Sequence, residues 1–169
     1  MAISMYNASV PVFKQLLDSL SNILQLADGH VSDNNIEAQD LLQASLFADM
    51  LNFSRQIQIA TDFAKGVSAR LAGVEVPAYE DNETSFAELQ ARVAKTLAFI
   101  TSIAPQMIDG SEEREIITRP GTPKEKKFNG QSYLLHYGLP QFFFHVTTAY
   151  DILRHKGVAI GKRDYMGVF

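Results

Sequence analysis

The chain has 169 residues, with 15 Lys and Arg against 19 Asp and Glu and no Cys, an ordinary length for one domain. The lack of Cys excludes disulfides, thiolate catalysis and iron–sulfur clusters, and a basic run of residues 124–127 that Glu125 interrupts is too weak to bind nucleic acid. There is no secretory signal and no apolar run of about 18 residues, so we expect a cytoplasmic protein that binds neither nucleic acid nor membrane.

The first predicted helix begins near Pro11, a residue that suits the first turn of a helix. Apolar residues then recur at helical spacing, and they are Phe13, Leu16, Leu17, Leu20, Ile23 and Leu24. Asp28 and Gly29 predict the end of this helix. A polar loop follows, and then a shorter helical stretch around Leu41–Met50.

Two further helices are predicted in the middle of the chain. Apolar residues from Phe53 to Leu71 repeat at spacings of three and four, and Gly73 predicts the end of that helix. After a loop, Ser85 and Glu88 have the spacing of a capping box, which predicts a helix start. The apolar face of this helix continues toward Pro105.

Residues 109–137 lack helical periodicity and contain β-branched residues with Pro-Gly and Asn-Gly pairs. They predict a long irregular link, with a short hairpin as one form of it. The last helix is predicted over about Leu139–Lys156, with Gly157 just past its end. An extended tail follows, and an ion pair between Arg163 and Asp164 is expected to dock it. Four long amphipathic segments predict an all-α fold, a four-helix bundle, in a single domain of residues 1–169.

Three polar side chains fall within apolar stripes of these helices. Gln141 and His145 are one turn apart on the last helix, and Gln56 shares the stripe of Phe53 and Ile57. They could meet inside the bundle as a polar pocket. A core histidine bonded to an amide is the structural alternative, because buried polar groups are normally paired and amides both donate and accept.

The run Phe142–Phe144 bears on association between chains. Successive helical residues point about 100° apart, so the three rings cannot all face the core. An aromatic ring that faces outward on such a helix favours a homodimer.

Two segments carry a resemblance to a known family. SRQIQIATDFAKGVSARLAG (residues 54–73) and LPQFFFHVTTAYDILRHKGVAIGKRDYMG (residues 139–167) resemble a bacterial family known as a domain of unknown function. That family is similar to the DinB/YfiT-like group of predicted metalloenzymes. The resemblance implies a four-helix bundle, often dimeric, that binds a divalent metal through three histidines, one on the second long helix and two at i and i+4 on the last. Members of the group include thiol transferases for bacillithiol or mycothiol and some isomerases.

The resemblance places His145 at the last of the three ligand positions, with Gln141 and Gln56 at the other two. It implies His145 as the metal ligand if zinc or nickel binds. An alternative is that His136 or Asp49 supplies a further ligand from a shifted position. Amide oxygens bind such metals weakly. We therefore expect no cofactor, and a pocket of Gln56, Gln141 and His145 that binds a small ligand or a partner. The alternatives are a divergent metal-dependent hydrolase or thiol transferase, and a structural dimerisation module.

Overall fold

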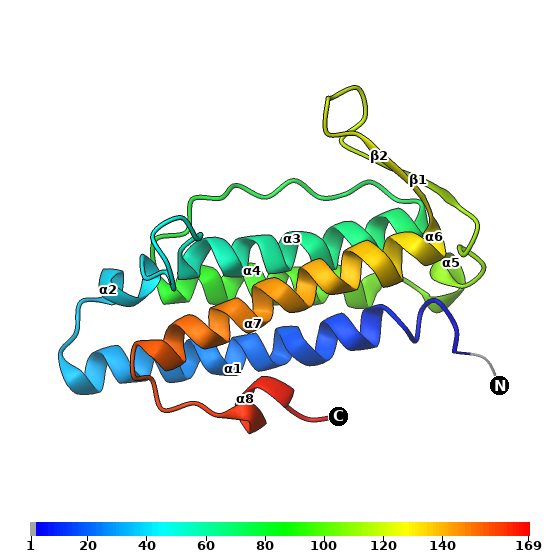
Figure 1. Cartoon of the computed structure of the whole chain (residues 1–169). Coiled ribbons are helices and arrows are strands. Elements are labelled where there is room, and N and C mark those ends of the chain that lie inside the picture. Colours follow the sequence, from blue (N-terminus) through cyan, green and yellow to red (C-terminus); the bar gives the residue numbers. More distant parts are fainter. Residues whose placement is uncertain (1–2) are drawn as a thin grey trace.

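The computed structural model describes residues 3–169, in which four long helices dominate. They are α1 (Val10–Asn34), α3 (Phe53–Ala72), α4 (Phe86–Ser102) and α7 (Leu139–His155). Figure 1 shows them alongside one another, with short helices around them: α2 (Ala38–Leu42), α5 (Pro105–Ile108), α6 (Gly130–Ser132) and α8 (Lys162–Met166). The prediction of a mainly helical chain is confirmed. No helix within residues 3–169 has the length and apolar character needed to cross a membrane.

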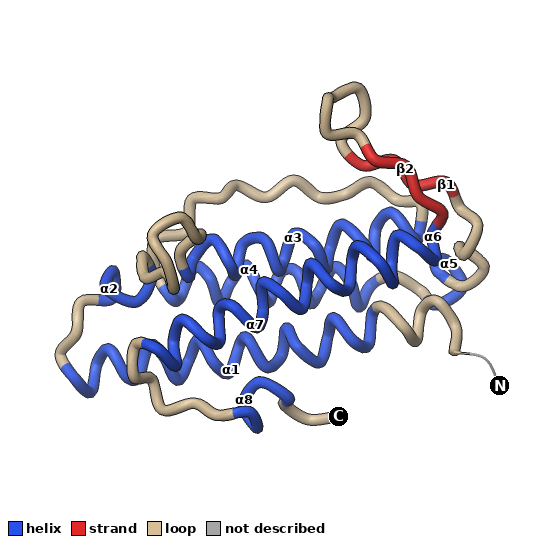
Figure 2. Tube along the Cα trace, viewed as in Figure 1, coloured by secondary structure: helices blue, strands red, loops and turns tan. Residues whose placement is uncertain are grey.

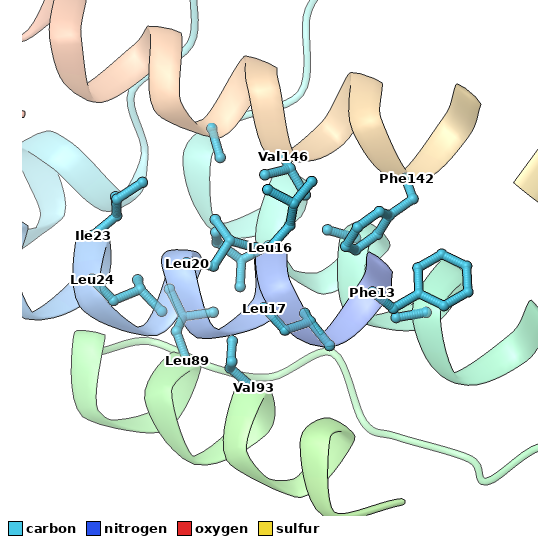
Figure 3. Packing of buried hydrophobic residues seen from close by; sticks show 14 of the residues in the cluster. Phe13, Leu16, Leu17, Leu20, Ile23, Leu24, Leu89, Val93, Phe142 and Val146 are labelled. Carbon is cyan, nitrogen blue, oxygen red and sulfur yellow. The ribbon is translucent and has the colours of Figure 1, made fainter. Parts of the chain in front are cut away.

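A shared apolar core holds the long helices together. Figure 3 shows Phe142 and Val146 of α7 on one side of α1, and Leu89 of α4 on another. Phe13 and Leu20 of α1 are fully buried between them. The rings of Phe13 and Phe142 meet edge to face with centroids 4.9 Å apart, an arrangement that aromatic pairs favour. Burial of each such side chain contributes about 1.5–3 kcal/mol.

Helix α1 is longer than predicted. It continues through Gly29 and ends at Asn34, and Asn35 then adopts the left-handed conformation with φ 52°. The Asn35 N–H donates to the Val31 carbonyl. The prediction of an end at Asp28 and Gly29 was wrong because one glycine inside a helix costs only about 1 kcal/mol, while asparagine supplies the left-handed cap.

The segment before α3 is less helical than predicted. Only Ala38–Leu42 forms a helix, and the remaining residues form turns. The Asn52 side chain caps α3 by accepting a hydrogen bond of 3.0 Å from the Arg55 N–H. Asp49 therefore lies outside α3, in an exposed turn.

Helix α3 ends as predicted, because Gly73 adopts φ 70° and closes it. The capping box of α4 is only half formed. The Ser85 hydroxyl accepts from the Glu88 N–H at 3.2 Å, as the box requires. The Glu88 carboxylate, however, accepts from Thr84 instead of Ser85.

Residues 74–84 form an extended strap along α3, drawn in tan in Figure 2. Arg92 of α4 fastens it, since its guanidinium binds Asp81 at 3.0 Å and Glu83 at 2.9 Å as well as Asp62 of α3 at 2.8 Å. The Arg92 side chain is only 2% exposed. Burial raises the pKa of Asp81, but the arginines beside it outweigh that effect and lower the pKa below its ordinary value.

A two-stranded antiparallel hairpin occupies the link before the last helix, as predicted. Its strands are β1 (Glu115–Thr118) and β2 (Lys126–Asn129). It projects from one end of the helices (Figure 1). The hairpin leads through α6 into η1 (Tyr133–Gly138), a π-helical turn in which the N–H of Leu139 donates to the Leu134 carbonyl five residues earlier.

The turn η1 runs directly into α7 and packs closely on α3. A Cβ at Gly138 would lie 2.7 Å from the Val67 Cγ2 atom, so glycine permits this approach. Phe128 of the hairpin packs against Tyr133 and Tyr137 of η1, with ring centroids 5.6 and 5.2 Å away. Apolar packing thus joins the hairpin to the helices.

The C-terminal tail contains helix α8 instead of being wholly extended. The Asp164 carboxylate caps α8 by accepting from the Gly161 N–H at 2.7 Å. Within residues 3–169 it forms no ion pair with Arg163. The predicted ion pair was therefore wrong, because the Asp164 carboxylate caps α8 instead. The tail is docked by the Tyr165 hydroxyl, 3.0 Å from the Thr147 hydroxyl.

Candidate functional site

His145 of α7 and Gln56 of α3 are joined by a direct hydrogen bond in the interior. The His145 Nδ1 and Gln56 Oε1 atoms are 2.7 Å apart. The Gln56 amide nitrogen donates to the Leu51 carbonyl at 3.0 Å. Because the amide oxygen therefore faces the imidazole and can only accept, Nδ1 carries the proton. Neutral His145 then has Nε2 as its acceptor.

Aromatic rings enclose His145. Its side chain is 8% exposed, it stacks on Phe63 with centroids 6.0 Å apart, and it meets the Phe144 ring edge to face. Burial lowers the pKa of His145 below its ordinary value, because the charged imidazolium is poorly solvated there. The pair is thus a neutral, hydrogen-bonded polar contact between two long helices.

Gln141 lies one turn before His145 but in different surroundings. It is half-buried and lines a shallow groove with His136, Tyr137, Pro140 and Phe144. Within residues 3–169 it makes no hydrogen bond to His145 or Gln56. Of the three predicted pocket residues, the structure therefore brings Gln56 and His145 into contact and leaves Gln141 beside them.

The side chains around His145 do not fit a three-ligand metal site. The Gln56 oxygen accepts from the imidazole, and amide oxygens are weak ligands for zinc or nickel. Asp49 and His136, the predicted substitutes, are both exposed. No three His, Cys, Asp or Glu side chains in the described part of the chain group in a way that could hold a metal ion.

A cleft of about 360 Å³ lies next to this pair and was not predicted. It shares the Phe63 ring with the His145 contact. Three elements line it. Helix α3 contributes Arg55, Ile59, Asp62, Phe63 and Arg70, the hairpin contributes Thr118 and Arg119, and η1 contributes Tyr133 and Tyr137.

The charges that line the cleft are unequally paired. Arg55 binds Asp81 of the strap at 2.7 Å, and Asp62 binds Lys65 and Arg92. Arg70 instead donates to two neutral oxygens, the Gly66 carbonyl and the Tyr133 hydroxyl, both at 3.1 Å. None of the six ion pairs in residues 3–169 includes Arg70 or Arg119. The cleft is therefore positively charged.

Local sequence explains how these side chains reach the cleft. A Cβ at Gly66 would lie 2.7 Å from the Arg70 Nη1 atom, so glycine lets the guanidinium lie flat on α3. The π-helical turn brings Tyr133 and Tyr137 to the same side, with their rings stacked at 5.9 Å.

The α3 part of the cleft had a sequence signal. Ile59, Asp62, Phe63 and Arg70 follow Arg55 at intervals of 4, 7, 8 and 15 residues, which places all five within one face of a helix at about 100° per residue. The tyrosines had no such signal, because the helical pattern of the last helix was recognised only from Leu139.

The arrangement of the long helices is similar to that of a solved protein. A crystal structure described as that of a DinB family member protein from Shewanella denitrificans is similar to this chain, with a TM-score of 0.90 and 34% sequence identity. The match covers 97% of this chain and 92% of that chain.

The model of the family described as Domain of unknown function (DUF1993) matches residues 5–166. The chain belongs to this DUF1993 family, and the resemblance predicted from residues 54–73 and 139–167 is confirmed. No curated protein matches the chain.

Proposed function

We propose that this DUF1993 protein is a four-helix bundle of the DinB type, a single cytoplasmic domain that binds a small molecule without a metal ion. In this proposal Gln56 and Gln141 take the positions of two of the three ligand histidines that the resemblance to the wider group implies. In this proposal His145 and Gln56 fasten α7 to α3, and the ligand occupies the cleft beside them. The observation that carries the proposal is this cleft, which shares Phe63 with the His145 contact.

The size and lining of the cleft support ligand binding. Small-molecule sites have volumes of about 300–1,000 Å³, apolar and aromatic walls and a few convergent polar groups. The cleft of about 360 Å³ has Phe63, Tyr137 and Ile59 as walls and arginines as polar groups. π-Helical turns, such as the one that supplies Tyr137, frequently mark functional sites.

The binding test is thermal unfolding with a panel of anionic, neutral and cationic small molecules. A true ligand at about 100 times its Kd stabilises the fold by about 2.7 kcal/mol. Ile59→Trp, which fills the cleft, is expected to abolish that stabilisation, while Leu26→Trp on the exposed side of α1 is the matched control. If no compound of any charge stabilises the protein, the proposal is overturned.

The metal test is elemental analysis of the purified protein before and after incubation with zinc or nickel. We expect no stoichiometric metal, and the same result for His145→Ala. Stoichiometric metal that is lost in His145→Ala would overturn the metal-free proposal. It would favour the alternative, a metal-dependent hydrolase or thiol transferase with His145 as a ligand.

We also infer that two copies of the chain associate. In support, apolar side chains beside His145 and Gln56 are exposed: Phe144, which meets the His145 ring, by 56%, and Leu51, whose carbonyl accepts from Gln56, by 46%. Light scattering at several protein concentrations is expected to give a dimer, and Phe144→Ser to shift it toward the monomer. A monomer at all concentrations would contradict the inference.

A further inference from the structure

We propose that the cleft binds the anionic group of a small molecule, a carboxylate or a phosphate, between Arg70, Arg119 and the Tyr133 hydroxyl. The inference rests on the proposed ligand-binding function and adds the chemical class of the ligand and the residues that recognise it. Three features of the cleft support it: a guanidinium without a counter-charge, a hydroxyl without an acceptor and an arginine held in an unfavourable backbone conformation.

Arg70 has donor capacity that the protein does not use. Its guanidinium carries five N–H groups, and its hydrogen bonds go only from Nη1, to the Gly66 carbonyl and the Tyr133 hydroxyl. No carboxylate in residues 3–169 pairs with it. A half-buried guanidinium is best satisfied by an anion, because its planar fork matches carboxylate and phosphate oxygens.

The Tyr133 hydroxyl supplies a second donor at the same place. Tyr133 is 1% exposed, and its oxygen accepts from Arg70 at 3.1 Å. Its own hydrogen has no acceptor within residues 3–169. Burial raises the pKa of Tyr133, so the phenol stays protonated and can donate to a ligand.

Arg119 lines the cleft from the hairpin side. Thr118 and Lys126 form the last residue pair of the hairpin ladder, and Arg119 follows with φ 51°. A side chain other than glycine in this left-handed region costs about 1–2 kcal/mol. Such strain is typical of ligand clamps and active sites. Here it holds a second unpaired guanidinium at the edge of the cleft.

The rest of the lining predicts the other half of the ligand. Arg55 and Asp62 are paired with protein groups, so they leave Arg70 and Arg119 as the unbalanced charges. Phe63 and Tyr137 form an aromatic wall, with ring centroids 5.8 Å apart. The preferred ligand thus carries an anionic group on a flat apolar body.

The experiment is calorimetric titration with four compounds that share one ring: benzoate, phenyl phosphate, benzyl alcohol and benzylamine. We expect benzoate, phenyl phosphate or both to bind, with affinity that falls as salt increases, and the tighter one identifies the anionic group. The neutral and cationic compounds are expected not to bind. Arg70→Gln and Arg119→Gln should each weaken binding by about 10- to 100-fold, as loss of a charged hydrogen bond does.

Arg119→Gly separates recognition from folding. Glycine adopts positive φ without strain, so this variant should unfold at the same temperature as the parent protein or a higher one, yet bind the anion about 10- to 100-fold more weakly. Lys124→Gln, which removes an exposed charge of the same hairpin outside the cleft lining, is the matched control and should bind normally.

Two outcomes overturn the inference and leave ligand binding in place. One is a preference for benzyl alcohol or benzylamine that Ile59→Trp abolishes. The other is anion binding that Arg70→Gln and Arg119→Gly leave unchanged. If none of the four compounds nor any compound of the wider panel binds, the proposed function itself fails as well.

Discussion

The contact between His145 and Gln56 shows how a polar pair can be kept inside an apolar core. Both side chains are nearly fully buried, and burying a polar group without a partner costs about 1–3 kcal/mol. Here the His145 Nδ1–H donates to the Gln56 amide oxygen, and the Gln56 amide nitrogen donates to the Leu51 carbonyl. The pair therefore fixes how α3 and α7 lie against each other.

Replacing Gln56 by Leu should destabilise the protein, because it leaves this hydrogen-bond network incomplete. The His145 Nδ1–H would lose its acceptor and the Leu51 carbonyl its donor, so we expect the free energy of unfolding to fall by about 1–3 kcal/mol in urea denaturation. The double variant Gln56→Leu/His145→Phe should lose less than the two single variants together, because both polar partners are gone. Full additivity would contradict the role of the hydrogen bond.

The pKa of His145 predicts a pH dependence of stability. Its pKa is lowered in the folded protein, from an ordinary value of about 6.5, so below that pH the unfolded chain binds a proton that the folded protein does not. Above about pH 6.5 this group therefore does not change the free energy of unfolding. As the pH drops below that value the free energy of unfolding falls, because protonation favours the unfolded chain.

Urea denaturation at pH 7.5 and pH 5.5 tests this effect. The parent protein should lose more stability between the two pH values than His145→Gln, which has no titrating group there. Equal losses in the two proteins would contradict the prediction.

Among the elements, α1 shows what a local signal can miss. Gly29 lies inside α1, and a Cβ there would meet no atom within 4 Å. Its flexibility weakens the helix without serving any packing. Gly73 is the opposite case, since it has φ 70° and a Cβ would lie 2.5 Å from the Arg114 guanidinium.

Gly29→Ala should raise the free energy of unfolding by about 0.5–1 kcal/mol, because alanine restricts the unfolded chain and favours the helix. Gly73→Ala is the matched substitution and should lower it by about 1 kcal/mol or more, because alanine at positive φ is strained. Thermal unfolding of the two variants measures both changes. Stabilisation by Gly73→Ala, or destabilisation by Gly29→Ala, would refute the assignment of their roles.

The long helices were predictable, since each has an apolar stripe that continues for several turns. The helix ends were less predictable. Gly73 ends α3 and Ser85 caps α4 as expected, whereas α1 continues through Gly29. The short helix α8 had no periodicity to reveal it. The contact of Gln56 with His145 followed from helix faces, but the cleft did not, because Arg119 and Tyr133 reach it only through the hairpin and η1.

At the scale of the whole molecule, the strap of residues 74–84 depends on side chains of the two helices that it connects. Arg92 binds two of its carboxylates and Asp62. The ring of Tyr79 lies beneath the amino groups of Lys65 and Lys95, at 3.6 and 4.3 Å from its centroid, and such cation–π contacts are stabilising. The network joins α3, α4 and the strap into one unit.

Arg92→Met should destabilise the protein by about 3 kcal/mol, the lower end for a broken buried ion pair, because Asp62 and Asp81 stay 41% and 36% exposed to water. Limited proteolysis should then cut within the strap. Lys14→Met, which breaks an exposed pair with Asp18 on α1, is the control and should change stability by less than about 1 kcal/mol. Equal effects of the two substitutions would contradict the role of Arg92.

The π-helical turn η1 affects how insertions and deletions act on this protein. A hydrogen bond that reaches back five residues instead of four accommodates one residue more than an α-helical turn. Deleting one residue from segment 133–138 would restore a regular helix and rotate everything before it by about 100° relative to α7. The core contacts of α7 would survive, while Tyr133 and the hairpin would turn away from the cleft. A relative that is one residue shorter here would keep its fold and lose the proposed binding cleft.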